Sequence, residues 1–142
     1  MIPVNSSVVS GVALSEVDSQ IKVLLMKRAK GGFWCHVAGS IEMGETAVQA
    51  IVREFHEETQ IQATELYNAQ FLETFYEDNA NKIELIPVFA VICPPNQAVI
   101  LNDEHTEFAW CSLEEALALA PFPNQHKLYK HIWEYFVDRP AH

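Results

Sequence analysis

The chain has 142 residues, of which 49% are apolar and 20% are charged, and its net charge is −10. This length suits one folded domain, and the apolar fraction excludes an intrinsically disordered chain. The acidic balance excludes duplex nucleic acid and anionic membrane surfaces as partners, because both carry negative charge. An anionic small molecule remains compatible, since a bound divalent cation can reverse the local charge of a site.

The three cysteines show no CxxC spacing, so a disulfide framework or a zinc site is not expected. The N-terminal residues lack the basic segment of a signal peptide. The longest apolar run, 85–93, is about half a membrane span and contains Pro87. We therefore expect a soluble protein in a reducing cytoplasm.

Alternating and β-branched apolar residues predict several strands, and turn residues separate them. The expected strands cover 4–14, 21–28, 33–37, 66–76, 84–93 and 108–111, with turns at 15–20 and 78–81 and a loop at 38–44. Expected helices cover 45–59, 112–120 with a capping box from Ser112 to Glu115, and 124–137. This mixture predicts an α/β sandwich around a mixed β-sheet, as a single domain over residues 1–142.

The expected helix at 45–59 carries an acidic stripe. Glu54, Glu57 and Glu58 fall within an arc of roughly 100° on its surface. Such like charges cost about 0.2–0.5 kcal/mol per pair, and the negative end of the helix dipole adds to the cost. A hard cation such as Mg²⁺ would offset both, because it prefers carboxylate oxygens. A solvated acidic face is the alternative.

The small and apolar residues of this helix, and the glycines before it, also have predicted roles. Ala47 and Ala50 extend the acidic stripe and would leave room for a substrate, while an apolar face would pack on the sheet; that face comprises Val48, Ile51, Val52 and Phe55. Gly39 and Gly44 flank the loop before the helix. Glycine lets the backbone approach a ligand closely, so a carbonyl there could complete a metal's oxygen shell.

The segment GSIEMGETAVQAIVREFHEETQI, residues 39–61, resembles the Nudix box, G-x5-E-x7-R-E-U-x-E-E-x-G-U, where U is a bulky apolar residue. Eight of the nine specified positions match: Gly39, Glu45, Arg53, Glu54, Phe55, Glu57, Glu58 and Ile61. Gln60 replaces the glycine that ends the family's helix in a left-handed conformation. The resemblance therefore leaves the end of the helix open.

The resemblance to Nudix hydrolases implies an α/β/α sandwich that binds one to three Mg²⁺ or Mn²⁺ ions along this helix. Carried onto this chain, Glu54 and Glu58 would be the main ligands, with Glu57 and the Gly39 carbonyl as further ligands. Arg53 and Glu45 would support them structurally.

Many such proteins supply one more acid from a loop before a late strand, and residues 102–110, NDEHTEFAW, resemble that element. Glu104 is the candidate here, as a metal ligand or general base, with Asp103 as a competitor. His105 is either functional or a structural hydrogen-bonding residue. Glu54, Glu57 and Glu104 all remain candidates for the general base that removes a proton from the attacking water.

The segment FWCHVAGSIEMGE resembles the nucleoside-triphosphate branch of the family, which includes dATP and dihydroneopterin triphosphate pyrophosphohydrolases. This resemblance implies hydrolysis of a triphosphate to a monophosphate and pyrophosphate by metal-activated water. Arg28, Ala38 and Trp34 are candidate substrate contacts. Aromatic residues could stack on a base or pack in the core: Phe33, Trp34, Phe75 and Tyr76.

Three alternative functions and the oligomeric state stay open at this point. A Nudix hydrolase could instead act on a dinucleoside polyphosphate, on ADP-ribose or on a nucleotide sugar. A non-catalytic module could bind nucleotide or protein, and an acidic interaction domain could use the glutamates only as a surface. The protein could be a monomer or a homodimer.

Overall fold

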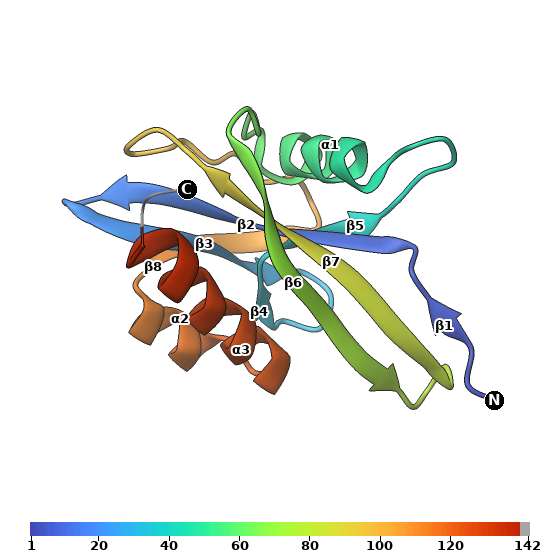
Figure 1. Ribbon diagram of the computed structural model, residues 1–142. Helices are drawn as coiled ribbons and strands as arrows, with labels where there is room; N and C mark the ends of the chain where they lie inside the picture. Colours follow the sequence, from blue (N-terminus) through green and yellow to red (C-terminus); the bar gives the residue numbers. More distant parts are fainter. Residues whose placement is uncertain (140–142) are drawn as a thin grey trace.

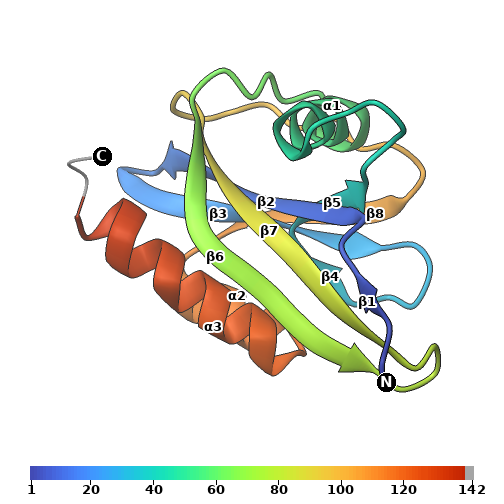
Figure 2. The same cartoon turned by 45° about the vertical axis from the view of Figure 1, so that its right-hand side comes forward.

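A computed structural model describes residues 1–139, and it consists of a mixed β-sheet between two helical layers. Helix α1 (Ala47–Thr59) covers one face of the sheet. Helices α2 (Leu113–Leu119) and α3 (Pro123–Ile132) cover the other face, as both views show (Figures 1 and 2). The expected α/β/α sandwich is confirmed.

The sheet has eight strands: β1 (Val4–Asn5), β2 (Val8–Val17), β3 (Gln20–Arg28), β4 (Trp34–Cys35), β5 (Val37–Ser40), β6 (Leu66–Glu77), β7 (Lys82–Ile92) and β8 (His105–Cys111). The order is β1-β7-β2-β3-β4, while β5 pairs with β2, β6 with β7 and β8 with β3. Strands β1 and β2 run parallel to β7, and the other pairs are antiparallel. The sheet is therefore mixed, as expected.

Alternating side chains divide the core into two parts, one on each face of the sheet. On β3, Leu24 and Met26 belong to the cluster that contains Phe55 of α1. Their neighbours Val23 and Leu25 belong to the cluster under α2 and α3. Successive side chains of a strand point to opposite faces, so one apolar strand contributes to both layers.

Several expected strand boundaries were wrong. Strand β7 covers 82–92 where 84–93 was expected, and β8 begins at His105, three residues earlier than expected. The strand expected at 4–14 is two strands, because β1 pairs with β7 near residue 83, whereas β2 pairs with β7 from residue 88 onward. The turn expected at 15–20 contains only Asp18 and Ser19, whose φ angles of 53° and 66° suit a two-residue hairpin. The strand expected at 33–37 divides at His36 between β4 and β5, which pair with different strands. Residues 38–40, expected in a loop, therefore belong to β5.

Helix α1 begins two residues later than expected and ends where it was expected to end. The Thr46 side chain caps it by accepting from the backbone N–H of Gln49, so Glu45 lies outside the helix. At the other end Gln60 adopts the left-handed conformation, with φ 61°, that glycine has in the family motif. The missing glycine has therefore not moved the end of the helix.

The C-terminal helix expected at 124–137 is α3 followed by one π-helical segment, Trp133–Val137. The segment closes with a backbone hydrogen bond of 2.8 Å from Asp138 N–H to the Trp133 carbonyl. Among residues 1–139, no helix is long and apolar enough to cross a membrane.

Candidate active site

Two of the three box glutamates lie on the buried face of α1. The face that packs on the sheet carries Ala50, Ile51 and Phe55, and Glu54 and Glu58 share it with exposures of only 8% and 1%. The carboxylates are therefore held in a low-dielectric site, where they cost free energy unless a partner compensates them. A merely solvated acidic face is inconsistent with this burial.

The expected orientation of α1 was partly wrong. Val48 and Val52, expected to pack on the sheet, are exposed to 48% and 39%. Ala50 is fully buried and Ala47 packs against the core, so these alanines fill space beside the sheet and do not leave room for a substrate. The helix is rotated so that its buried stripe ends in the two glutamates, which places them at the site.

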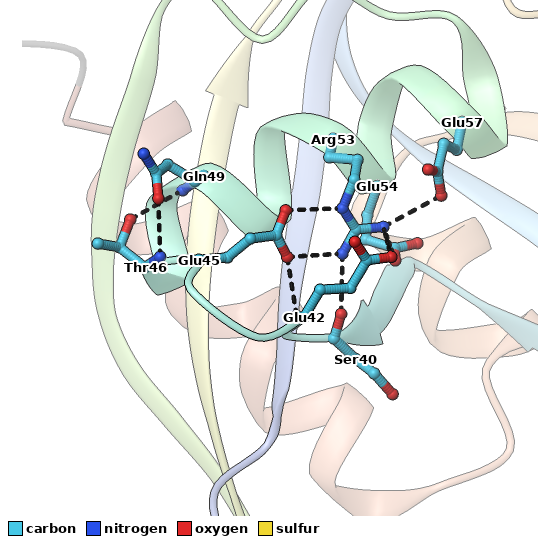
Figure 3. Close-up of polar contacts among 8 residues, drawn as sticks. All are labelled: Ser40, Glu42, Glu45, Thr46, Gln49, Arg53, Glu54 and Glu57. Carbon is cyan, nitrogen blue, oxygen red and sulfur yellow. Dashed lines mark hydrogen bonds and ion pairs between the residues drawn. The ribbon is translucent and has the colours of Figure 1, made fainter.

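Arg53 connects the loop before α1 to the helix (Figure 3). Its guanidinium donates to both carboxylate oxygens of Glu45 at 2.8 and 2.9 Å and to the Ser40 carbonyl at 2.9 Å. A third nitrogen, Nη1, donates to Glu54 at 2.8 Å and to Glu57 at 3.1 Å. One planar side chain thus sets the positions of three carboxylates, which a lysine could not reproduce.

Glu45 is the anchor of this arrangement. Its hydrogen bonds from Arg53 and from the Glu42 backbone lower the pKa of Glu45 to about 2. The hydrogen bond to Glu45, followed by the one to Glu54, raises the pKa of Arg53. Glu45 therefore stays ionised at any working pH, and it fixes the loop against the helix.

Gly39 lies directly against the carboxylate of Glu54. A Cβ atom on residue 39 would overlap both the carboxylate carbon and its oxygens. A side chain on residue 39 would therefore displace the Glu54 carboxylate. Strand β5 brings the Gly39 backbone to this place through its pairing with Val9 of β2.

Glu58 forms a compact group with Glu104 and His105. One potential ligand atom from each of these residues lies within 4.8 Å of the other two. The loop acid is positioned by backbone contacts, since Ala29 N–H donates to the Glu104 carbonyl at 2.9 Å and His105 pairs with Arg28 across β8 and β3. Asp103, the competing candidate, is exposed and does not belong to this group.

The electrostatics of this group suit a divalent cation. Burial raises the pKa of Glu58 to about 10, with further increases from a hydrogen bond and negative charge of Glu54 and from the charge of Glu104. Oε2 of Glu58 and Nδ1 of His105 are buried and have no hydrogen-bond partner among the described residues. A bound divalent cation would satisfy these atoms and remove the repulsion between the carboxylates.

A pocket of about 780 Å³ adjoins this group, and Gly39, Glu58, Glu104 and His105 line it. Two of the expected substrate contacts, Arg28 and Ala38, also line it. The third, Trp34, does not line this pocket, because it packs against the core beneath α2 and α3. Its neighbour Phe33 takes the place in the pocket wall.

Of the four aromatic candidates, Phe33 and Phe75 line the pocket, whereas Trp34 and Tyr76 do not. Phe33 lies edge-on to Phe122 with ring centroids 5.4 Å apart, and the Arg28 guanidinium lies 5.1 Å from the Phe33 ring centre. Phe75 lines the pocket, whereas Tyr76 does not. Alternation along β6 explains this difference, because neighbouring side chains point to opposite faces.

Sequence reasoning missed a buried polar group on the pocket wall. His36 and Glu73 line the pocket, and His36 contacts Tyr129 of α3. Glu73 lies 37 positions and Tyr129 lies 93 positions after His36 in the chain, so no local motif could connect the three residues. The sequence carried no signal for this group.

Comparison with known proteins identifies the family of this chain. The NUDIX domain family matches residues 6–132. A Myxococcus xanthus protein named octanoyltransferase is 34% identical over 115 residues, 78% of this chain and 32% of that protein, so the chain spans about a third of its length. The CTP pyrophosphohydrolase of Escherichia coli is 28% identical over 134 residues, 92% of this chain and 96% of that one. The mouse asymmetrical bis(5′-nucleosyl)-tetraphosphatase is 28% identical over 127 residues, 87% and 86% of the two chains.

Solved structures agree in fold. A Caenorhabditis elegans Ap4A hydrolase complex superposes with a TM-score of 0.82 at 23% identity, covering 95% of this chain and 99% of that one. The E. coli dihydroneopterin triphosphate pyrophosphohydrolase superposes with a TM-score of 0.78 at 22% identity, covering 97% and 99%. The chain therefore belongs to the Nudix family, and its relatives place it among the Nudix hydrolases.

Proposed function

We propose that this protein hydrolyses a nucleoside triphosphate, or a related triphosphate, to a monophosphate and pyrophosphate with the help of Mg²⁺ or Mn²⁺. The observation that carries the proposal is the buried, unpartnered carboxylate oxygen of Glu58 beside Glu104 and His105, at the wall of a substrate-sized pocket. A buried acid without a partner is unstable as an ion and becomes stable with a cation.

Glu58, Glu54 and Glu104 would hold one to three metal ions, with Glu57 and the Gly39 carbonyl as further ligands. The bound metal would neutralise phosphate oxygens and acidify a water molecule for attack on phosphorus. Arg53 keeps Glu54 and Glu57 in place, so these carboxylates need little reorganisation.

Other residues of the chain have roles outside the metal site. Arg28 would bind a phosphate, because its guanidinium lines the pocket beside Phe33. Phe33 and Phe75 would enclose the base. The general base is Glu54, Glu57 or Glu104, of which Glu57 and Glu104 are the more exposed to water.

A second candidate substrate is a dinucleoside polyphosphate. The mouse relative, at 28% identity, and the C. elegans structure, with a TM-score of 0.82, carry names that specify this activity or its Ap4A substrate. The same catalytic group would serve, because both reactions place water on a phosphorus atom of a phosphate anhydride. ADP-ribose and nucleotide sugars are further alternative substrates, because each also contains a phosphate anhydride.

The test is hydrolysis of a panel of substrates with Mg²⁺ or with EDTA, in which chromatography separates the nucleotide products and free pyrophosphate is measured alongside them. The panel contains canonical and oxidised deoxynucleoside triphosphates, dihydroneopterin triphosphate, diadenosine tetraphosphate, ADP-ribose and a nucleotide sugar. We expect Mg²⁺-dependent pyrophosphate from a triphosphate, its loss in Glu58→Gln, and its retention in the control Glu114→Gln on the exposed side of α2.

Cleavage of the dinucleotide or ADP-ribose alone would retain the metal chemistry and contradict the triphosphate assignment. Absence of all turnover despite Mg²⁺ binding would contradict the proposed function and favour a non-catalytic binding module. Absence of both turnover and a Mg²⁺-dependent thermal shift would favour an acidic interaction domain.

A further inference from the structure

The pocket wall holds a second acidic group, separate from the box glutamates. Glu73 of β6 and His36, between β4 and β5, both line the pocket, and their side chains are 10% and 5% exposed. The His36 Nε2 atom lies 3.4 Å from each Glu73 oxygen, and the Ser10 hydroxyl donates to Oε2 of Glu73 at 2.8 Å. Tyr129, fully buried on α3, lies 2.9 Å from His36 Nδ1 and fixes the ring from behind.

This group holds a carboxylate at one orientation and in its charged form. Desolvation is the largest single influence on the pKa of Glu73, and by itself it would raise that pKa. The charge of His36 and hydrogen bonds from His36 and Ser10 nevertheless lower the pKa of Glu73. An ionised carboxylate accepts hydrogen bonds and donates none, so the pocket wall at this point accepts only N–H or O–H groups.

Glu73 also has acceptor capacity that its protein contacts leave unused. A carboxylate offers about four lone-pair sites. Among the contacts of residues 1–139, only the Ser10 hydrogen bond to Oε2 is short, and the contact between Oε1 and His36 is 3.4 Å long.

Glu84, a buried glutamate on the neighbouring strand β7, differs in this respect. Its two oxygens accept from the Asn5 amide at 2.9 and 3.1 Å, Lys82 lies 3.2 Å away, and it does not line the pocket.

A carboxylate on a pocket wall discriminates among the rings of nucleotide-like substrates. Two adjacent N–H donors fit its two oxygens in a bidentate pair. Adenine and cytosine place a ring acceptor next to their amino group, so one of their two atoms would repel the carboxylate. Guanine and pterins share a ring N–H next to an amino group, and both atoms donate.

We infer that Glu73, fixed by His36 and Ser10, is a specificity-determining residue that accepts hydrogen bonds from the ring N–H and amino group of a 2-amino-4-oxopyrimidine ring, the edge shared by guanine and pterins. The inference rests on the proposed function in placing the base of the substrate in this pocket. It names the class of base, which the metal site cannot select because it contacts only phosphates.

The experiment measures binding of GMP, AMP, CMP and neopterin to the full chain with Mg²⁺ by titration calorimetry. Wild-type protein is expected to bind GMP or neopterin at least about tenfold more tightly than AMP or CMP, since a buried acceptor rejects a ring that cannot donate to it.

The variant Glu73→Gln replaces one acceptor oxygen with a donor. Its affinity for GMP and neopterin should fall by about tenfold, while its affinity for AMP is unchanged or rises, because an amide pairs well with adenine. The matched control, Glu84→Gln, removes a buried charge outside the pocket and should keep the wild-type ratios. Equal loss for all four probes in Glu73→Gln would overturn the inference and leave Glu73 a structural residue.

Wild-type protein that binds AMP or CMP as tightly as GMP and neopterin, or binds none of the four, would also overturn the inference. This wild-type ratio decides the matter even if Glu73→Gln does not fold. Binding of these probes requires no hydrolysis, so the two proposals can fail separately. A preference for GMP without turnover of any triphosphate contradicts the proposed function alone, and triphosphate turnover without the preference contradicts this inference alone.

Discussion

The carboxylate of Glu54 occupies the space that a side chain on residue 39 would need. Glu54 reaches this place from α1, and Gly39 reaches it from β5. Gly39 and Glu54 of the box therefore pack directly against each other, so the side chain allowed at residue 39 depends on the place of the Glu54 carboxylate.

Replacing Gly39 by alanine should displace Glu54 and weaken both stability and activity. Overpacking of this kind costs about 1–3 kcal/mol, and the displaced carboxylate loses its hydrogen bond from Arg53. Chemical denaturation with EDTA and Mg²⁺-dependent turnover would measure the two effects. Because Glu54→Ala vacates the space, the double variant should regain part of the stability that Gly39→Ala loses. Additive losses in this cycle would contradict the direct contact.

Metal-free protein should lose stability as the pH rises above neutrality. Burial raises the pKa of Glu58 to about 10, whereas an unfolded glutamate titrates near 4.5. The folded state therefore keeps a proton that the unfolded state releases, so this stabilisation is complete below about pH 4.5 and is lost progressively as the pH approaches 10. For one proton the slope cannot exceed about 1.4 kcal/mol per pH unit.

Denaturation curves in EDTA between pH 6 and 9 would measure this slope. The neutral variant Glu58→Gln should reduce it, because residue 58 then no longer titrates. Addition of Mg²⁺ should stabilise wild-type protein at pH 8, where the cation replaces the proton, and should stabilise the variant less. A variant with the same slope as wild type would show that another group causes the pH dependence.

The sequence predicted the local parts of this site because they are periodic or contiguous. The box spacing placed Arg53, Glu54 and Glu58 on one helix, and the helix ended at Thr59 as expected. The rotation of that helix was not predictable from hydrophobicity alone. Val48 and Val52 are more apolar than the glutamates but are exposed, since the buried stripe continues into the carboxylates that form the site.

Contacts between distant segments could not be predicted. His36 contacts Glu73 and Tyr129 because the fold brings the end of β4, strand β6 and helix α3 together. No spacing in the sequence predicts that these three segments lie side by side. The loop acid Glu104 was found only through resemblance. Its grouping with Glu58 depends on the pairing of β8 with β3, which the sequence did not specify.

Glu104 and Asp103 provide a matched pair of loop acids. Glu104→Gln should lower Mg²⁺-dependent turnover by at least about 10²-fold, whether it holds metal or acts as general base. Asp103→Asn should remain within about twofold of wild type, because Asp103 lies outside the cluster with Glu58 and His105. Both residues are exposed, so neither change should alter folding. Steady-state kinetics with varied Mg²⁺ would separate the roles, since a lost ligand raises the Mg²⁺ requirement. Greater loss in Asp103→Asn would assign the role to the other acid.

Gln60→Gly should stabilise the protein. Gln60 has φ 61°, in the left-handed region that costs a residue with a side chain about 1 kcal/mol relative to glycine. We expect a rise in melting temperature of roughly 3–5 °C. Turnover should be unchanged, because Gln60 is exposed and, among residues 1–139, does not belong to the group of Glu58, Glu104 and His105. Gln62→Gly is the control: Gln62 is exposed but is not among the residues with positive φ, so glycine there should lower stability by about 0.5–1 kcal/mol. Destabilisation by Gln60→Gly would mean that contacts of the glutamine side chain outweigh the backbone strain.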